Sequence, residues 1–249
     1  MRLCFLGNGS AVPGAGNGFT SLLVGAGPAL VLVDAGDNAY RSILEAGEDP
    51  LAFDAVALTH GHADHLGGFP ALVAALDCIG RRKELVAVAQ PAVEAQARSL
   101  LALFGLAPGS LSFPLRFAAA WGAEAIGVGL LDGNHGIPTA MVDFRSGGAR
   151  LLYTSDTRYD PDRLAAVAGS CQTLIHEATY SHASLPADTG HSSALQAGLA
   201  ASEVGAETLF LCHFQESAYR GSDDPGAEAA RVFAGHVIVP ELLTWYPIP

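Results

Sequence analysis

Three histidines and one aspartate lie within six residues of one another in the segment ALTHGHADHLGG, residues 57–68. They are His60, His62, Asp64 and His65, and the whole chain has nine histidines. Imidazole nitrogens and carboxylate oxygens are ligands of Zn²⁺, and also of Mn²⁺ and Fe. Four such groups with so few residues between them predict a metal site. The segment by itself does not indicate which reaction the metal would serve.

Further side chains of the same types follow strand-like runs elsewhere in the chain. They are His135 in the turn DGNHGIP, Asp156 after LLYTS, His176 and Glu177 at the end of TLIHE, and His213 after LFLC. A single histidine at a strand end is usually solvated, and Asp156 alone could cap a helix. However, ligands of open α/β sheets collect at the carboxyl ends of the strands, so we expect these groups to meet at one edge. One tetrahedral site cannot use seven ligands, so two metal ions that share a carboxylate are predicted. The seven are His60, His62, Asp64, His65, His135, Asp156 and His213.

Short apolar runs alternate with helical patterns, and these elements must position the ligands. The strand-like runs are residues 2–7, 21–27, 29–36, 55–60, 84–90, 172–178, 208–214 and 236–240, and the helical patterns are residues 38–47, 91–105, 161–169, 193–205 and 226–235. Residues 139–156 predict a hairpin that turns at Ser146-Gly147-Gly148. Because hairpins and helical crossovers both occur, we expect one α/β domain with mixed sheets over residues 1–249.

Charge and composition narrow the classes of partner. The formal net charge is −12, and Lys83 is the only lysine. A face that neutralises many phosphates needs basic residues, so a large RNA partner is disfavoured. No apolar run reaches the roughly 18 residues of a membrane span, and the N-terminus resembles a strand more than a signal peptide, so a cytoplasmic protein without a membrane partner is expected. The four cysteines are far apart and predict free thiols, most of them buried.

The motif THGHADHLGG resembles the signature loop of the metallo-β-lactamase superfamily. DAGD at Asp34, NHG at His135, SDT at Asp156 and CHF at His213 resemble the other motifs of that superfamily, in the same order and along nearly the whole chain. The resemblance implies an αββα four-layer sandwich with mixed sheets. It also implies a dinuclear metal site at one edge of the two sheets.

The same resemblance implies a role for each ligand. The first metal would be held by His60, His62 and His135, the second by Asp64, His65 and His213, with Asp156 bridging the two. A metal-bridging hydroxide would be the nucleophile, and Asp64 would also help to orient or deprotonate it. Asp34 would support the histidine loop from behind. Zinc is the expected metal, with manganese and iron as alternatives.

Several motifs are similar to those of ribonuclease Z proteins in particular. They are the opening GNGSAVPGAGNGFTSLLV and the later YTSDTR, LIHEAT and GHSS. The resemblance implies a phosphodiesterase in which Glu177 and His191 deliver a proton to the leaving oxygen. The segment TGHSS could instead be only the cap of the helix that follows it, through Ser192 or Ser193, and both roles are compatible.

One departure from that group concerns the partner. Ribonuclease Z proteins carry a long arm with glycines and lysines between their third and fourth motifs, which grips tRNA. Here only 20 residues, GIPTAMVDFRSGGARLLYTS, separate His135 from Asp156, and the predicted hairpin uses all of them. Folded tRNA is therefore a doubtful partner, and a small-molecule or short single-stranded phosphodiester is expected. Homodimers are common in the superfamily, so a homodimer stays open.

Three other functions remain open at this point. The same metal site could hydrolyse acyl or sulfate esters, as in a lactonase, thioesterase or arylsulfatase, and a lipophilic pocket under residues 99–113 would favour this. A tRNA 3′-processing endonuclease is a second alternative, and a metal-binding scaffold without activity is a third. An oxygen-reducing flavodiiron protein is disfavoured, because His62 stands where that branch has glutamate and no flavin domain follows.

Overall fold

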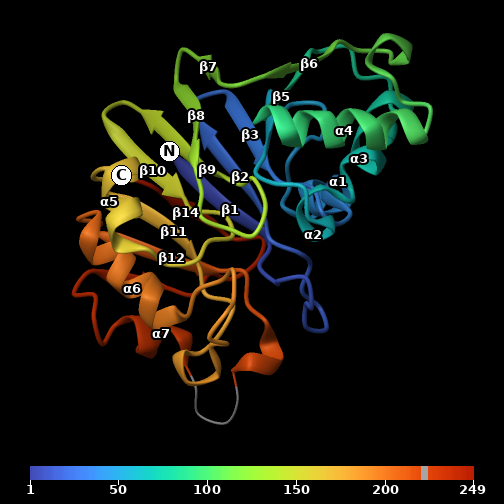
Figure 1. The fold of residues 1–249 in the computed structure, drawn as a ribbon. Helices are drawn as coiled ribbons and strands as arrows, with labels where there is room; N and C mark the ends of the chain where they lie inside the picture. The colour runs from blue at the N-terminus through green and yellow to red at the C-terminus, as the bar shows by residue number, and fades with distance from the viewer. Residues whose placement is uncertain (220–223) are drawn as a thin grey trace.

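The computed structural model describes residues 1–219 and 224–249, and two sheets lie at its centre (Figure 1). The first sheet has the strand order β14-β1-β2-β3-β4-β5-β6. Its strands are β1 (Arg2–Gly7), β2 (Ser21–Ala26), β3 (Ala29–Val33), β4 (Ala55–Leu58), β5 (Leu85–Ala89), β6 (Leu115–Ala118) and β14 (Trp245–Pro247). We had no sequence-based expectation for β6 or β14, which lie at the two edges of the sheet.

The second sheet has the strand order β13-β12-β11-β10-β9-β8-β7. Its strands are β7 (Trp121–Ala123), β8 (Ile126–Asp132), β9 (Ala140–Ser146), β10 (Ala149–Tyr153), β11 (Thr173–Glu177), β12 (Thr208–Cys212) and β13 (His236–Ile238). Each sheet is antiparallel in one half and parallel in the other, so both are mixed as expected.

The hairpin of β9 and β10 has the turn that the sequence predicts. Ser146 pairs with Ala149, and the two residues between them, Gly147 and Gly148, have φ angles of +57° and +89°. Two consecutive positive φ angles suit a tight turn whose twist matches that of the strands, and glycine adopts them without steric cost. The chain between His135 and Asp156 therefore has room for this hairpin and for no further arm.

Helices cover the outer face of each sheet and complete the four-layer αββα sandwich (Figure 1). The helices on the first sheet are α1 (Ala39–Glu45), α3 (Phe69–Cys78) and α4 (Pro91–Leu103), and those on the second are α5 (Pro161–Ala168), α6 (Ala194–Glu203) and α7 (Pro225–Ala229). The four-residue helix α2 (Ala63–Leu66) lies inside the histidine loop. Short 3-10 turns are formed by Pro108–Ser110, His182–Ser184 and Glu216–Ala218.

The central core lies between the two sheets, and this explains the composition of the strands. Phe5, Val31 and Val86 of the first sheet meet Val142, Ile175 and Phe210 of the second there. Alternate residues of the same strands pack against the helices instead, so strands such as β4 (AVAL) and β5 (LVAVA) are buried on both faces. Strands covered on both faces are continuously apolar.

Local sequence signals predict one helix end correctly and another incorrectly. Helix α6 has a capping box, in which the Ser193 hydroxyl accepts from the Gln196 amide and the Gln196 side chain accepts from the Ser193 amide, as its sequence allows. The helix predicted over residues 226–235 is wrong in length, because α7 ends at Ala229. After it the amides of Arg231 and Val232 bond three residues back rather than four, and this tighter turn brings Phe233 into the core.

The cysteines are all free thiols, as the sequence predicts. Cys4, Cys171 and Cys212 are buried free thiols, and Cys78 is an exposed free thiol. Among the residues that the structure describes, no helix is both long and apolar enough to cross a membrane.

Candidate metal centre

The seven ligand-type side chains meet at one edge of the sandwich, where strands of both sheets end. Two groups there each have donor atoms within 4.8 Å of one another. The first group is His60, His62, His135 and Asp156, and the second is Asp64, His65, Asp156 and His213. All seven predicted ligands are therefore brought together, and Asp156 belongs to both groups.

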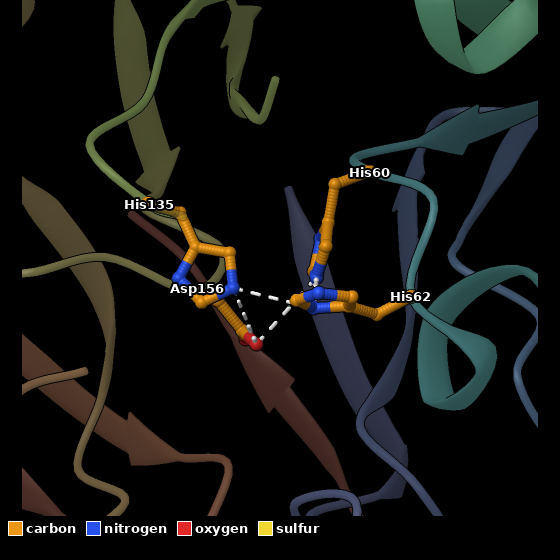
Figure 2. A group of neighbouring side chains, drawn as sticks. All are labelled: His60, His62, His135 and Asp156. Atoms are coloured by element: carbon orange, nitrogen blue, oxygen red, sulfur yellow. Dashed lines mark hydrogen bonds and ion pairs between the residues drawn. The ribbon is translucent and has the colours of Figure 1, made fainter. Parts of the chain in front are cut away.

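The first group joins the two sheets across their shared edge (Figure 2). His60 and His62 come from the loop after β4, and His135 follows β8 of the other sheet. Nδ1 of His62 lies 3.1 Å from Nε2 of His60 and 3.3 Å from Nε2 of His135. In a tetrahedral zinc site, Zn–N bonds of about 2.0–2.1 Å place ligand nitrogens roughly 3.3 Å apart. The spacing of these imidazoles therefore fits a metal ion.

The second group lies on the other side of Asp156. Nε2 of His65 is 3.3 Å from Nε2 of His213, and Oδ2 of Asp64 is 3.7 Å and 3.5 Å from those same two atoms. His65 is fully buried and His213 nearly so. One carboxylate and two imidazole nitrogens therefore converge here as well.

Asp156 carries the clearest sign of an ion-binding arrangement. It is 1% exposed, and neither of its carboxylate oxygens has a hydrogen-bond partner. Oδ1 lies 3.3 Å and 3.2 Å from Nε2 of His65 and His213, whereas Oδ2 faces His60 at 3.6 Å. Burial of this carboxyl opposes its ionisation, but the neighbouring imidazoles of His213 and His65 prevail and hold its pKa well below the ordinary value. An ionised, buried and unbonded carboxylate between two sets of imidazoles fits divalent cations.

The protonation states of the first group suit metal binding. Burial, followed by the neighbouring imidazole of His65, lowers the pKa of His60 far below its ordinary value, and burial and His135 lower the pKa of His62. Both rings are therefore neutral at physiological pH. Neutral imidazole is the form that binds a metal.

Asp34 supports the histidine loop from behind, as the resemblance implies. It is fully buried, and its carboxylate accepts hydrogen bonds from the Thr59 amide, from the Thr59 hydroxyl and from Nδ1 of His65, each at 2.8 Å. The bond to Nδ1 leaves Nε2 of His65 free to face Asp156.

Strained backbone marks the same edge of the sheets. Asp34, Ser155 and His213 have φ angles of +55°, +56° and +60°, which non-glycine residues rarely adopt. These residues follow β3, β10 and β12. His213 is itself a predicted ligand, Ser155 precedes Asp156, and Asp34 accepts a hydrogen bond from His65. Residues held in such conformations concentrate at functional sites, where the surrounding structure enforces them.

Glu177 and His191 form a pair beside the two clusters. Nδ1 of His191 donates to Oε1 of Glu177 at 2.9 Å and lies 3.9 Å from Asp156. Burial works to lower the pKa of His191, but the hydrogen bond and charge of Glu177 outweigh it and raise the pKa to about 9. A protonated imidazole at this edge can give a proton to a departing oxygen. His176 does not join the site, because its Nδ1 donates to the Glu177 carbonyl and its side chain lines a separate small cavity.

A cavity of about 310 Å³ opens over the clusters. Its lining comes from the N-terminal loop, the histidine loop and the segments after β10, β11 and β12: Ser10, Ala11, Val12, His62, Ala63, Asp64, Asp156, Thr179, Tyr180, His191, His213 and Gln215. No lysine or arginine is among these residues. A larger cavity, of about 640 Å³, lies between β13, β14 and α7 and is lined by none of the seven predicted ligands.

A lipophilic hollow does exist beside α4, but it is separate from this cavity. It measures about 390 Å³ and is lined by Leu66, Leu100 and Leu103 together with Gly61, Ala95, Gln96 and Ser99. It shares no residue with the cavity over the clusters. A lipophilic hollow is therefore present under part of residues 99–113, but it does not line the cavity over the clusters.

The comparison with protein families agrees with this geometry. Residues 22–214 match the model of the beta-lactamase superfamily domain. The chain belongs to the beta-lactamase superfamily. A relative named ribonuclease Z, from Natronomonas pharaonis, is 27% identical over 97% of this chain and 96% of its own. That match extends over 300 aligned positions, more than the 249 residues of this superfamily member, so the relative has insertions that are missing here.

Solved structures of the superfamily share the whole fold. The metallo-beta-lactamase fold protein YhfI from Bacillus subtilis aligns with a TM-score of 0.84 at 22% identity, over 98% of both chains. The short form of human tRNase Z aligns with a TM-score of 0.79 at 18% identity, over all of both chains.

Sequence reasoning missed the groups that orient the histidines. The Thr59 hydroxyl lies 3.0 Å from Nδ1 of His60, the Thr179 hydroxyl lies 2.9 Å from Nδ1 of His213, and the Gly190 carbonyl accepts from Nδ1 of His135 at 2.9 Å. Thr59 and Thr179 stand inside the quoted motifs THGH and HEAT, but nothing in their types or spacing indicates which imidazole they contact.

Proposed function

We propose that this protein is a metal-dependent phosphodiesterase of the ribonuclease Z type. The observation that carries the proposal is the Glu177–His191 pair next to the two ligand clusters. The clusters alone would serve many hydrolytic reactions, whereas an alkoxide leaving group needs a proton donor. The ribonuclease Z relative, similar over nearly the whole chain, supports the same function.

Two divalent cations are proposed as cofactors, zinc first, with manganese or iron as alternatives. His60, His62 and His135 would hold one, Asp64, His65 and His213 the other, and Asp156 would help to hold both. Bound there, the cations would supply a hydroxide nucleophile and neutralise charge on the phosphoryl oxygens. Since each sheet contributes ligands to both clusters, residues 1–249 are proposed to act as one hydrolase domain.

The side chains of the protein would then perform three tasks. Asp64, whose pKa is lowered by the neighbouring His213 in spite of burial, would accept a hydrogen bond from the nucleophile and orient it. His191 would protonate the leaving oxygen. Glu177 would hold His191 in its protonated form and in the right direction.

The cavity supports a small or short phosphodiester as the substrate. Among the residues that the structure describes, no lysine or arginine lines it to pair with several phosphates, and the chain carries a net charge of −12. The hairpin of β9 and β10 replaces any tRNA-binding arm between His135 and Asp156. Folded tRNA is therefore not the substrate that we propose.

Hydrolysis of bis-p-nitrophenyl phosphate tests this function. The purified protein, loaded with Zn²⁺ or Mn²⁺, should release p-nitrophenolate, and the His62→Ala variant should not. Lactones, thioesters and aryl sulfates test the alternative of acyl or sulfate ester hydrolysis. Precursor tRNA with a 3′ trailer tests the alternative of tRNA processing. Turnover no higher than that of His62→Ala with both metals would rule out the phosphodiesterase.

A homodimer is proposed to form through the uncharged surface at the C-terminal end of α4 and the segment that follows it. Leu103 and Phe104 are 79% and 69% exposed, beside the lipophilic hollow, and no residue between Arg98 and Arg116 is charged. Two copies with a charge of −12 each repel one another, and an uncharged contact face keeps like charges from meeting directly. Under two-fold symmetry, Phe104 of each copy can enter the hollow of the other copy, so this surface is complementary to itself.

Light scattering after size exclusion measures this association. The protein should elute at about twice its 25.6 kDa mass, and Phe104→Asp should elute as a monomer. Val239→Asp changes an exposed residue that follows β13 and should leave the dimer intact. A monomeric wild type at micromolar concentration would contradict the proposal.

A further inference from the structure

Two buried carboxylates at the metal centre have the same arrangement of partners. Asp34 accepts one imidazole directly, that of His65, and is joined to a second, that of His60, through the Thr59 hydroxyl. Glu177 accepts the imidazole of His191 directly and is joined to that of His213 through the Thr179 hydroxyl. Both carboxylates are fully buried. Each of them therefore has contact with two imidazoles of the site.

The direction of each hydrogen bond around Thr179 can be assigned. The Thr179 hydroxyl lies 2.6 Å from Oε2 of Glu177 and 2.9 Å from Nδ1 of His213. A hydroxyl has one proton, and an ionised carboxylate can only accept, so the hydroxyl donates to Glu177. Its oxygen is then the acceptor for the proton on Nδ1 of His213. The tautomer of His213 is thereby fixed, with its lone pair on Nε2.

That lone pair is the one that faces the metal site. Nε2 of His213 lies 3.2 Å from Oδ1 of Asp156 and 3.3 Å from Nε2 of His65. The opposite tautomer would place a proton between these groups and remove a ligand from the second cluster.

The backbone holds Thr179 and His213 in place relative to each other. The Thr179 amide donates to Oε2 of Glu177 at 3.1 Å, and the Thr179 carbonyl accepts from the Gln215 amide, two residues after His213, at 3.1 Å. Thr179 is 2% exposed, so water does not compete for its hydroxyl. The contact is therefore a built feature of the fold and not a chance approach of two side chains.

We propose that Thr179 is a positioning residue through which Glu177 fixes the metal-binding tautomer of His213. The Glu177 carboxylate then positions both the proposed proton donor and a proposed metal ligand. It accepts a hydrogen bond from His191 directly, and it is joined to His213 through Thr179. This inference rests on the proposed metal site but not on the identity of the substrate. Thr59 provides the equivalent link from Asp34 to His60, and it supplies a control from the same protein.

Zinc titration of the metal-free protein against a chromophoric chelator tests the proposal. Thr179→Val keeps the shape of the side chain but removes the hydroxyl, and it should weaken one of two zinc ions roughly 10- to 100-fold. Thr179→Ser keeps the hydroxyl and should bind both ions as the wild type does. Thr59→Val should weaken zinc as well.

Two results would overturn the proposal. One is a folded Thr179→Val protein that binds both ions with wild-type affinity, and the other is a serine variant as weak as the valine variant. If the valine variant does not fold, the nitrogen NMR spectrum of the zinc-loaded wild type decides instead: Nδ1 of His213 should carry a proton protected from exchange with water, and a bare Nδ1 would contradict the inference. Failure of wild-type protein to bind zinc at all would instead refute the proposed function.

Discussion

Replacing Asp156 with asparagine should reduce turnover of bis-p-nitrophenyl phosphate by at least about 10²–10³-fold. Asparagine has nearly the same shape, but it carries no charge and offers one oxygen where Asp156 offers two. Asp156 is the one side chain common to both ligand clusters, and its two oxygens have no other partner. The loss should therefore appear in kcat and also in the amount of metal bound.

The same substitution should remove much of the stabilisation that zinc gives to the fold. A ligand present at 100 times its Kd stabilises a protein by about 2.7 kcal/mol, which for a chain of this size raises Tm by roughly 5–10 °C. We expect such a rise for the wild type and little or none for Asp156→Asn. Asp160→Asn is the matched control, since Asp160 caps α5 outside the clusters and asparagine caps equally well. Equal zinc-induced shifts in the two variants would contradict the bridging role.

Replacing His191 with alanine should have an effect that depends on the leaving group. A dinucleoside monophosphate expels an alkoxide, which needs a proton, so its hydrolysis should slow by about 10²–10⁴-fold. Bis-p-nitrophenyl phosphate expels a stable anion and should lose much less. Both substrates meet the same metal site, so a damaged site would slow them alike. Equal losses on the two substrates would show that His191 is not the proton donor.

The pH profile of Glu177→Gln examines the other half of this pair. The negative charge of Glu177 raises the pKa of His191 to about 9, against the effect of burial. Without that charge the pKa of His191 falls, so the proton is lost at lower pH. Activity on the dinucleoside should then begin to fall at lower pH than in the wild type. Bound cations lower the pKa in both proteins, so the shift between the two profiles is the quantity to measure.

Much of the site could be predicted because metal ligands depend on residue type and on strand ends. The His60 loop, Asp156 and His213 each follow a strand, and the carboxyl ends of neighbouring parallel strands lie at one edge of a sheet. The order of the motifs was enough to predict the four-layer fold. Local chemistry also predicted the turn at Gly147-Gly148 and the cap at Ser193.

Other features could not be predicted because they depend on packing between distant segments. The edge strands β6 and β14 are held by pairing with β5 and β1 and have little pattern of their own. The helix α7 ends early because Phe233 turns into the core, although its sequence favours a longer helix.

By itself, the sequence predicted seven metal-ligand side chains and, beside them, the pair of Glu177 and His191. Only the tertiary structure decided that Asp156 faces one cluster with each oxygen, and that Thr179 joins Glu177 to His213. The physical reason is that residue type and spacing determine which element a side chain belongs to and which face it occupies. The proton on an imidazole, in contrast, is fixed by one hydrogen bond, and here that bond spans 34 residues of sequence.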